Sequence, residues 1–366
     1  MLRHRVTYGR LALACALAAI VSVFGGLGVA LADEAEEKVC VPVVDKQVLE
    51  DSTGAWSHVA DAAFGDVVRY RITSTMPDNL DEYDTYEWWV VDWPDDAEAM
   101  AIDESSVTAT LVDASGARTD ITERLSVSVG DGSMRVGTPD VRRAVEGIAS
   151  TDVIEVEYEA KISSRAGVGM DGSNDNFCHV VHTARDGSGM STTPDVRARV
   201  LVWAMSLSKV SATDGRALAN AIFELRDASG GVVATFTTDG RGRAHVDGID
   251  SGEYRLVETR APVGFEAVDD VRLTISPSMS DGGAAALAAH ARGADVSSTD
   301  VRRGVVGLTV VDSESATHVP DRPDTEDMPK TSDALTVLGM VLVAGGIGAA
   351  AFGISLSRRK STYEDR

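Results

Sequence analysis

The strongest constraint on the fold is a repeated two-residue alternation of apolar and polar side chains. It is clearest in three runs, at 67–73, 153–158 and 198–202, which are rich in β-branched residues. Half-buried strands have this period and this composition. Short turns with Asp-Gly or Ser-Gly separate such runs, as at 130–132 and 229–231. Many short strands at this spacing predict an all-β protein built from immunoglobulin-like β-sandwiches.

The N-terminal segment has the pattern of a secretory signal peptide. Three arginines precede an uncharged apolar run that begins at Leu11, and Ala30-Leu31-Ala32 supplies a small-x-small cleavage site. We therefore predict that residues 1–32 are a signal peptide, with an uncleaved membrane anchor as the alternative.

A second apolar segment lies near the C-terminus. Residues 334–356 carry no charge and are numerous enough to cross a bilayer as a transmembrane helix. Arg358, Arg359 and Lys360 follow at once, which predicts that this end stays in the cytoplasm. A plain single-span membrane surface protein is one interpretation of this arrangement.

A short motif directly before that segment favours a different interpretation. It reads Met328, Pro329, Lys330, Thr331, Ser332. Motif, apolar span and basic tail together resemble the Leu-Pro-x-Thr-Gly sorting signal of Gram-positive cell-wall proteins, with Met in place of Leu and Ser in place of Gly. The resemblance implies a sorting signal over 328–366, cleavage after Thr331 by a sortase, and transfer to a peptidoglycan precursor or another pilin subunit. The protein would then be extracellular, anchored to the cell wall, and in the membrane only through its sorting helix.

Between these ends we expect two β-sandwich domains in tandem. The boundary near Thr193-Pro194-Asp195 gives a first domain over 33–199 and a second over 200–313, with a linker over 314–327. A Gly- and Ala-rich stretch at 279–300 is expected to be a surface insertion in the second domain.

Composition excludes several classes of function. The formal net charge of −23 argues against binding to nucleic acid. Three cysteines are too few for a zinc ribbon or an iron–sulfur centre, so we expect no metal and no cofactor. No nucleophile elbow or phosphate loop appears, so an enzyme that turns over a substrate is not expected.

The second domain carries the most specific motif. The stretch from Tyr254 to Phe265 reads Tyr-Arg-Leu-Val-Glu-Thr-Arg-Ala-Pro-Val-Gly-Phe. It resembles the E box of the collagen-adhesin B-type repeat found in Gram-positive pilins. That resemblance implies an isopeptide bond from Lys209 to Asp312 on the last strand, assisted by Glu258.

This bond has a physical basis. Burial in an apolar core favours a neutral, nucleophilic lysine amine, and a buried carboxyl can keep the proton that the reaction needs to move. Two groups held rigidly together react as if at very high concentration. The alternative is that Lys209, Glu258 and Asp312 form only a salt-bridged cluster.

The first domain resembles the isopeptide-forming fimbrial domain that precedes this repeat in pilins. The runs 43–48, 65–72 and 86–92 carry the resemblance, which implies Lys46 at the bonding position and Asp92 as its assisting acid. Where that family has Asn-Thr-Ala, this chain has His182 followed by Thr and Ala. Histidine cannot form the amide, so we expect a vestigial site without a bond.

Cys40 and Cys178 are the two cysteines that remain after removal of the leader. Each lies an even number of residues before an expected bonding position, Lys46 or His182, and so shares its strand face. If the first and last strands run in parallel, as in the family, the thiols come close together. An exported chain then favours a disulfide, with two separate buried thiols as the alternative.

Together these features predict a pilin-like subunit or adhesin stalk. The family's polymerisation lysine is missing from 199–205, which favours a basal or tip subunit, although Lys161 remains a candidate acceptor. A monomeric adhesin that binds a host ligand through the Trp-rich segment 88–93 is an alternative.

Overall fold

The computed structural model describes residues 41–172, 174–280 and 282–315. Strands dominate this part of the chain, and its helices are single turns at Leu80–Glu82, Thr122–Arg124 and α2 (Val141–Ala144). The prediction of an all-β protein is therefore confirmed. The expected signal peptide, Cys40, the sorting motif and the apolar C-terminal segment lie outside the described residues. Within them, no helix is long and apolar enough to cross a membrane.

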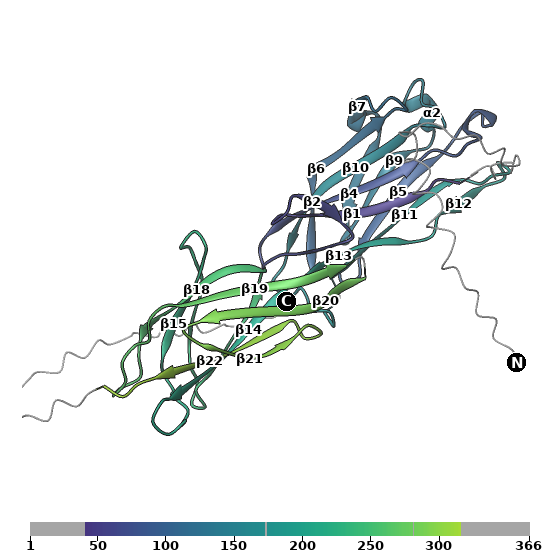
Figure 1. Ribbon diagram of the computed structural model, residues 1–366. Coiled ribbons are helices and arrows are strands. Elements are labelled where there is room, and N and C mark those ends of the chain that lie inside the picture. Colours follow the sequence, from purple (N-terminus) through teal and green to yellow (C-terminus); the bar gives the residue numbers. More distant parts are fainter. Residues whose placement is uncertain (1–40, 173, 281, 316–366) are drawn as a thin grey trace, which may run out of the picture. The chain divides into compact units, whose positions relative to one another are not determined.

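Two sheets form the first sandwich (Figure 1). Side chains along their strands alternate between more and less buried positions. The six-stranded sheet has the order β2 (Ala55–Ser57), β1 (Val44–Glu50), β4 (Val67–Thr75), β10 (Val153–Ile162), β6 (Met100–Val112), β7 (Arg118–Asp120). The other sheet has the order β3 (Val59–Asp61), β13 (Val196–Leu201), β11 (Asp175–Thr183), β5 (Trp88–Pro94), β9 (Ser133–Thr138), β8 (Ser126–Gly130), and β12 (Met190–Thr192) pairs with β11. Their facing side chains form one hydrophobic core.

The second sandwich has its own core and two further sheets. The first is ordered β17 (Arg243–Ile249), β14 (Trp203–Ser211), β22 (Val305–Asp312), β21 (Asp295–Asp300). The second is ordered β16 (Val232–Thr237), β15 (Ile222–Asp227), β18 (Gly252–Arg260), β19 (Val271–Ser280), β20 (Gly283–Arg292). The first strand, β14, and the last, β22, lie side by side and parallel, with Lys209 opposite Val310.

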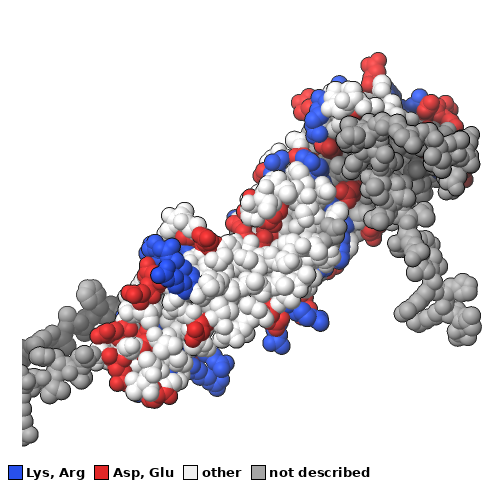
Figure 2. Space-filling view, in the orientation of Figure 1, with Lys and Arg blue, Asp and Glu red and all other residues white. Residues whose placement is uncertain are grey.

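The structure corrects the expectation of a surface insertion at 279–300. This stretch continues β19 and forms β20 and β21, which pair with β19 and β22 respectively. The surface over β19 and β20 is largely free of charged side chains in Figure 2. Alanine and glycine are poor strand formers by themselves, so the composition concealed two strands that pairing with neighbours stabilises.

A hydrogen-bonded joint connects the two sandwiches. The Trp203 indole Nε1 donates to Asp61 Oδ2 at 2.6 Å, and the Ser251 backbone N–H donates to the same oxygen at 3.2 Å. Asp250 hydrogen-bonds to Asp61, and burial together with the Asp61 charge raises the pKa of Asp250 to about 9. Two carboxyls in contact without a basic partner cannot both ionise cheaply, so this joint holds a proton at neutral pH.

Candidate functional site

The second sandwich encloses a buried lysine between two carboxyls. Lys209 on β14 donates to Glu258 Oε2 on β18 at 3.0 Å and to Asp312 Oδ1 on β22. All three side chains are fully buried. The structure thus brings together the three residues that the sequence predicted here. Lys209 and Asp312 belong to one sheet, because β14 and β22 are neighbours, whereas Glu258 reaches across from the opposite sheet.

The electrostatics of this triad favour proton exchange. Burial raises the pKa of Glu258, while a hydrogen bond from the Val268 N–H and the charge of Lys209 oppose that rise. The Phe223 ring lies 5.3 Å from Lys209 Nζ and excludes water on that side. Glu258 Oε1 and Asp312 Oδ2 have no hydrogen-bond partner. Buried polar atoms rarely lack a hydrogen-bond partner. The two unpartnered oxygens therefore favour a chemical role for this cluster over a purely structural one.

A second buried lysine lies in the core of the first sandwich. Lys46 on β1 donates to Asp92 Oδ2 on β5 and, at 2.9 Å, to the Tyr158 hydroxyl on β10. Asn176 on β11 donates from Nδ2 to the same hydroxyl at 2.7 Å. Lys46, Asp92 and Asn176 are each fully buried. The chain therefore places a lysine, an acid and a carboxamide around one hydroxyl.

The assignment of His182 to the bonding position is corrected by this geometry. His182 pairs with Trp88, four residues along β5 from Asp92, and its ring stacks on Tyr86. Asn176 occupies the place beside Lys46 that His182 was expected to fill. Residues 176, 178, 180 and 182 share one face of β11, so the alternation identified the face but not the position along it.

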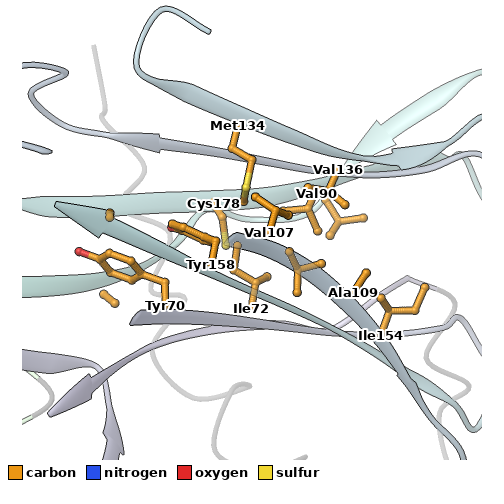
Figure 3. Packing of buried hydrophobic residues seen from close by; sticks show 14 of the residues in the cluster. Tyr70, Ile72, Val90, Val107, Ala109, Met134, Val136, Ile154, Tyr158 and Cys178 are labelled. Atoms are coloured by element: carbon orange, nitrogen blue, oxygen red, sulfur yellow. The ribbon is translucent and has the colours of Figure 1, made fainter. Parts of the chain in front are cut away.

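Cys178 lies at the same level as this cluster. It pairs with Asp92 across β11 and β5, and its side chain points with Tyr70 and Tyr158 into the space between the sheets (Figure 3). Burial raises the pKa of its thiol to about 12. Because Lys46 also lies at this level, a thiol six residues earlier on an extended strand would be about 20 Å away. A disulfide therefore requires the chain before Val41 to turn back.

The Trp-rich segment divides between the two faces of β5. Trp88 lies in the core, whereas Trp89 and Trp93 are half-buried on the outer face. Trp93 stacks on Phe177 with ring centroids 5.9 Å apart, and the Arg135 guanidinium lies 4.2 Å from the Trp89 ring. In the described part of the chain, no group of three His, Cys, Asp or Glu side chains could hold a metal ion.

Comparison with known proteins finds similar sequences and folds. The family model described as "SpaA: Prealbumin-like fold domain" matches residues 204–283, which include Lys209 and Glu258. No curated protein matches the chain.

Three solved structures of pilin proteins are similar to it. The group B streptococcus pilus 2b backbone protein is 20% identical, with 75% of this chain and 98% of that chain covered and a TM-score of 0.54. The T6 backbone pilin of serotype M6 Streptococcus pyogenes is 16% identical, with coverage of 75% and 70% and a TM-score of 0.55. A 35 kDa C-terminal fragment of the major pilin GBS80 of Streptococcus agalactiae is 15% identical, with coverage of 64% and 91% and a TM-score of 0.50. At these identities the similarity establishes a shared fold.

Proposed function

We propose that the chain is an exported structural subunit of a Gram-positive cell surface, of the pilin type, hardened by internal covalent bonds. The observation that carries this proposal is the fully buried cluster of Lys209, Glu258 and Asp312 within a fold shared with pilin proteins. Burying a lysine with two carboxyls costs free energy of desolvation. A chain that keeps such a cluster in its core therefore favours a function for it. The chemistry is a single event within each molecule, so the protein is not an enzyme that turns over a substrate.

The bond in the second sandwich joins Lys209 Nζ to Asp312 Cγ and releases water. Burial raises the pKa of Glu258, which suits this carboxyl to the role of the acid that protonates the departing oxygen. The bond closes a loop between residues 103 positions apart. By the chain-entropy argument for cross-links, that stabilises the fold by about 4–5 kcal/mol.

A second bond in the first sandwich is supported by the position of Asn176. Lys46 and Asn176 both hydrogen-bond to the Tyr158 hydroxyl, so the polar ends of their side chains lie around one buried oxygen. A carboxamide releases ammonia on forming the amide, and Asp92 is the acid at this site. This proposal replaces the expected vestigial site, which depended on His182.

The disulfide between Cys40 and Cys178 is also part of the proposal, because an exported chain with two cysteines favours their oxidation. It requires the residues before Val41 to fold back over the core. Reduction of the intact protein would add two hydrogens if the bond exists, and none if both thiols are free.

Anchoring is proposed through the motif from Met328 to Ser332, with a sortase as partner and a peptidoglycan precursor or another pilin subunit as acceptor. Lys161 is exposed on β10, whereas Lys46 and Lys209, the other lysines of the described residues, are buried. Lys161 is thus the described lysine whose amine is accessible as an acceptor. Because residues 199–205 carry no lysine, a basal or tip position is favoured over a repeating backbone position.

Ligand binding is a second candidate function. The half-buried outer face around Trp89, Trp93 and Phe177 offers aromatic rings on which a host sugar or peptide could stack. Binding of the exported chain to immobilised glycans or matrix proteins, lost in a Trp93→Ser variant that still folds, would favour an adhesin.

The intact mass of the exported chain, residues 33–331, tests the structural proposal. We expect the loss of one water and one ammonia relative to the calculated mass. Asp312→Ala and Glu258→Ala should abolish the loss of water alone, and Asn176→Ala the loss of ammonia alone. The full calculated mass in the native protein would contradict both cross-links and leave an ordinary surface module.

A further inference from the structure

The Tyr158 hydroxyl occupies the centre of the first-sandwich cluster. It accepts a hydrogen bond from Lys46 Nζ at 2.9 Å and one from Asn176 Nδ2 at 2.7 Å. It donates to Asp92 Oδ1 at 2.9 Å. One hydroxyl thus contacts the attacking nitrogen, the acid and the leaving nitrogen of the reaction proposed for this site.

The carboxamide of Asn176 is held from one side only. Its nitrogen contacts Tyr158, whereas its oxygen is buried and has no hydrogen-bond partner. A structural asparagine in a core normally has both ends satisfied. The nitrogen that would leave is therefore the atom in contact with the hydroxyl, and no hydrogen bond holds the carbonyl oxygen in place.

Burial favours the protonated forms of both oxygen acids on this path. It raises the pKa of Tyr158 well above its usual value of 10, and the nearby Asp92 carboxyl adds to that rise. It also raises the pKa of Asp92, against the opposing effects of Lys46 and of the hydrogen bonds from Tyr158 and Asn176. A path of two oxygen acids thus leads from Lys46 to the Asn176 nitrogen.

We propose that the Tyr158 hydroxyl is a catalytic proton relay between Asp92 and the leaving nitrogen of Asn176. The inference rests on the Lys46–Asn176 cross-link proposed above. The neutral Lys46 amine forms a bond to Asn176 Cγ and gives one proton to Asp92 Oδ2. When Asn176 Cγ becomes tetrahedral, its Nδ2 gains a lone pair, and the Tyr158 O–H turns from Asp92 Oδ1 to that nitrogen and gives it a proton. Asp92 then gives a proton from Oδ1 to the Tyr158 oxygen. The Cγ–Nδ2 bond breaks, ammonia leaves, and both oxygen acids return to their initial states.

A tyrosine elsewhere in the same core provides the matched control. Tyr86 is as fully buried as Tyr158. Its hydroxyl has no hydrogen-bond partner, and its ring contacts Tyr83 and His182. Removing either hydroxyl takes one oxygen from the same core, but the Tyr86 hydroxyl has no contact with the reacting groups. Tyr70 cannot serve, because its hydroxyl hydrogen-bonds to Asn176.

The test measures the rate of the reaction in Tyr158→Phe and Tyr86→Phe. The exported chain is purified unfolded, before any bond has formed, and then refolded. Ammonia release and the Lys46–Asn176 cross-linked peptide are followed by mass spectrometry, and folding is followed separately by tryptophan fluorescence. The rate of water loss at Lys209 and Asp312, measured in the same sample, is the internal reference. We expect Tyr158→Phe to slow ammonia release by about 10²-fold and Tyr86→Phe to leave it within about twofold of the native rate.

Each outcome distinguishes the relay from the cross-link itself. Ammonia release at the native rate in Tyr158→Phe overturns the relay and leaves the cross-link standing. No ammonia release in the native chain overturns both. If Tyr158→Phe fails to fold, the native chain is refolded in D₂O instead. A relay that moves two protons predicts ammonia release about twofold slower or more than in H₂O, and an unchanged rate contradicts it.

Discussion

The two buried lysines differ in which layers their bonds would join. In the first sandwich Lys46 lies on β1 of one sheet, whereas Asp92 and Asn176 lie on neighbouring strands of the other. In the second sandwich Lys209 and Asp312 lie on neighbouring strands of the same sheet. A Lys46–Asn176 bond therefore fastens two layers to each other, and a Lys209–Asp312 bond fastens the first strand of a domain to its last. The same chemistry serves two mechanical purposes.

Force applied to the chain ends should give the largest difference between the two sandwiches. Tension entering β14 passes through Lys209 directly to Asp312 at the end of β22, so the second sandwich should not extend. In the first sandwich about 25 residues, 177–201, lie beyond the bond and can be drawn out by about 80 Å. Single-molecule pulling should show this one short extension.

The variant Lys209→Ala tests that argument. Without the bond the second sandwich should unfold under force and lengthen by more than about 300 Å. Lys161→Ala, on the exposed surface, should pull like the native chain. Full extension of the second sandwich in the native protein would show that no bond protects it.

The next largest effect is on equilibrium stability, in Lys209→Met and Lys46→Met. Each variant removes one of the proposed cross-links, which would contribute about 4–5 kcal/mol, and leaves buried carboxyls without their cation. Two acids, Glu258 and Asp312, remain beside residue 209. Only Asp92 remains beside residue 46, and Tyr158 still donates a hydrogen bond to it. We therefore expect the larger fall in denaturation midpoint for Lys209→Met. Lys161→Met is the control, and equal losses at both sites would remove the distinction.

The sequence predicted the second site better than the first for a physical reason. Glu258 sits in a local motif that resembles the E box, and the same resemblance implied Asp312 at the end of the last strand. That strand is the direct neighbour of β14, which carries Lys209, so the three residues meet as expected. The first site is formed across two sheets, and the relative position of β1 and β11 depends on core packing rather than on local pattern. Asn176 was missed although it shares a face with Cys178 and His182. The signal that could have found it is an asparagine on the same face of the strand as Cys178 and Val180, where side chains point inward.

The pH dependence of the lysine variants sharpens the comparison further. The pKa of Glu258 is already raised from 4.5 in the folded state, and removing the Lys209 charge raises it further. The folded state then holds a proton that the unfolded state releases, so stability falls as pH rises above about 4.5. We expect Lys209→Met to lose up to about 1.4 kcal/mol per pH unit over that range. Urea denaturation at pH 4 and pH 7 measures the slope, and a flat profile would show that Glu258 stays ionised.

The joint between the sandwiches is a third buried acid site, and it has no lysine. Because the pKa of Asp250 is raised to about 9, its protonated form stabilises the fold at low pH, and that stability declines as pH rises from about 4 towards 9. Asp250→Asn should raise the thermal midpoint at pH 8 and leave it nearly unchanged at pH 4. Asp247→Asn, at an exposed position paired with His245, is the control. If Asp250→Asn leaves the midpoint at pH 8 unchanged, the carboxyls of Asp61 and Asp250 do not share a proton.

The smallest expected effect comes from exchanging the leaving groups. Asp312→Asn and Asn176→Asp should still form their bonds, because the attacked carbon keeps its place and only the departing atom changes. The cross-linked products are chemically identical to the native ones, so mass and stability should match the native protein within error. What changes is the released molecule: Asp312→Asn should release a second ammonia and Asn176→Asp none. Enzymatic measurement of ammonia after refolding distinguishes them. Loss of the bond at either site on this exchange would contradict the prediction and show that the reaction depends on the identity of the leaving atom. At Asn176 that outcome would point to the contact between Tyr158 and the leaving nitrogen, because no such contact is exchanged at Asp312.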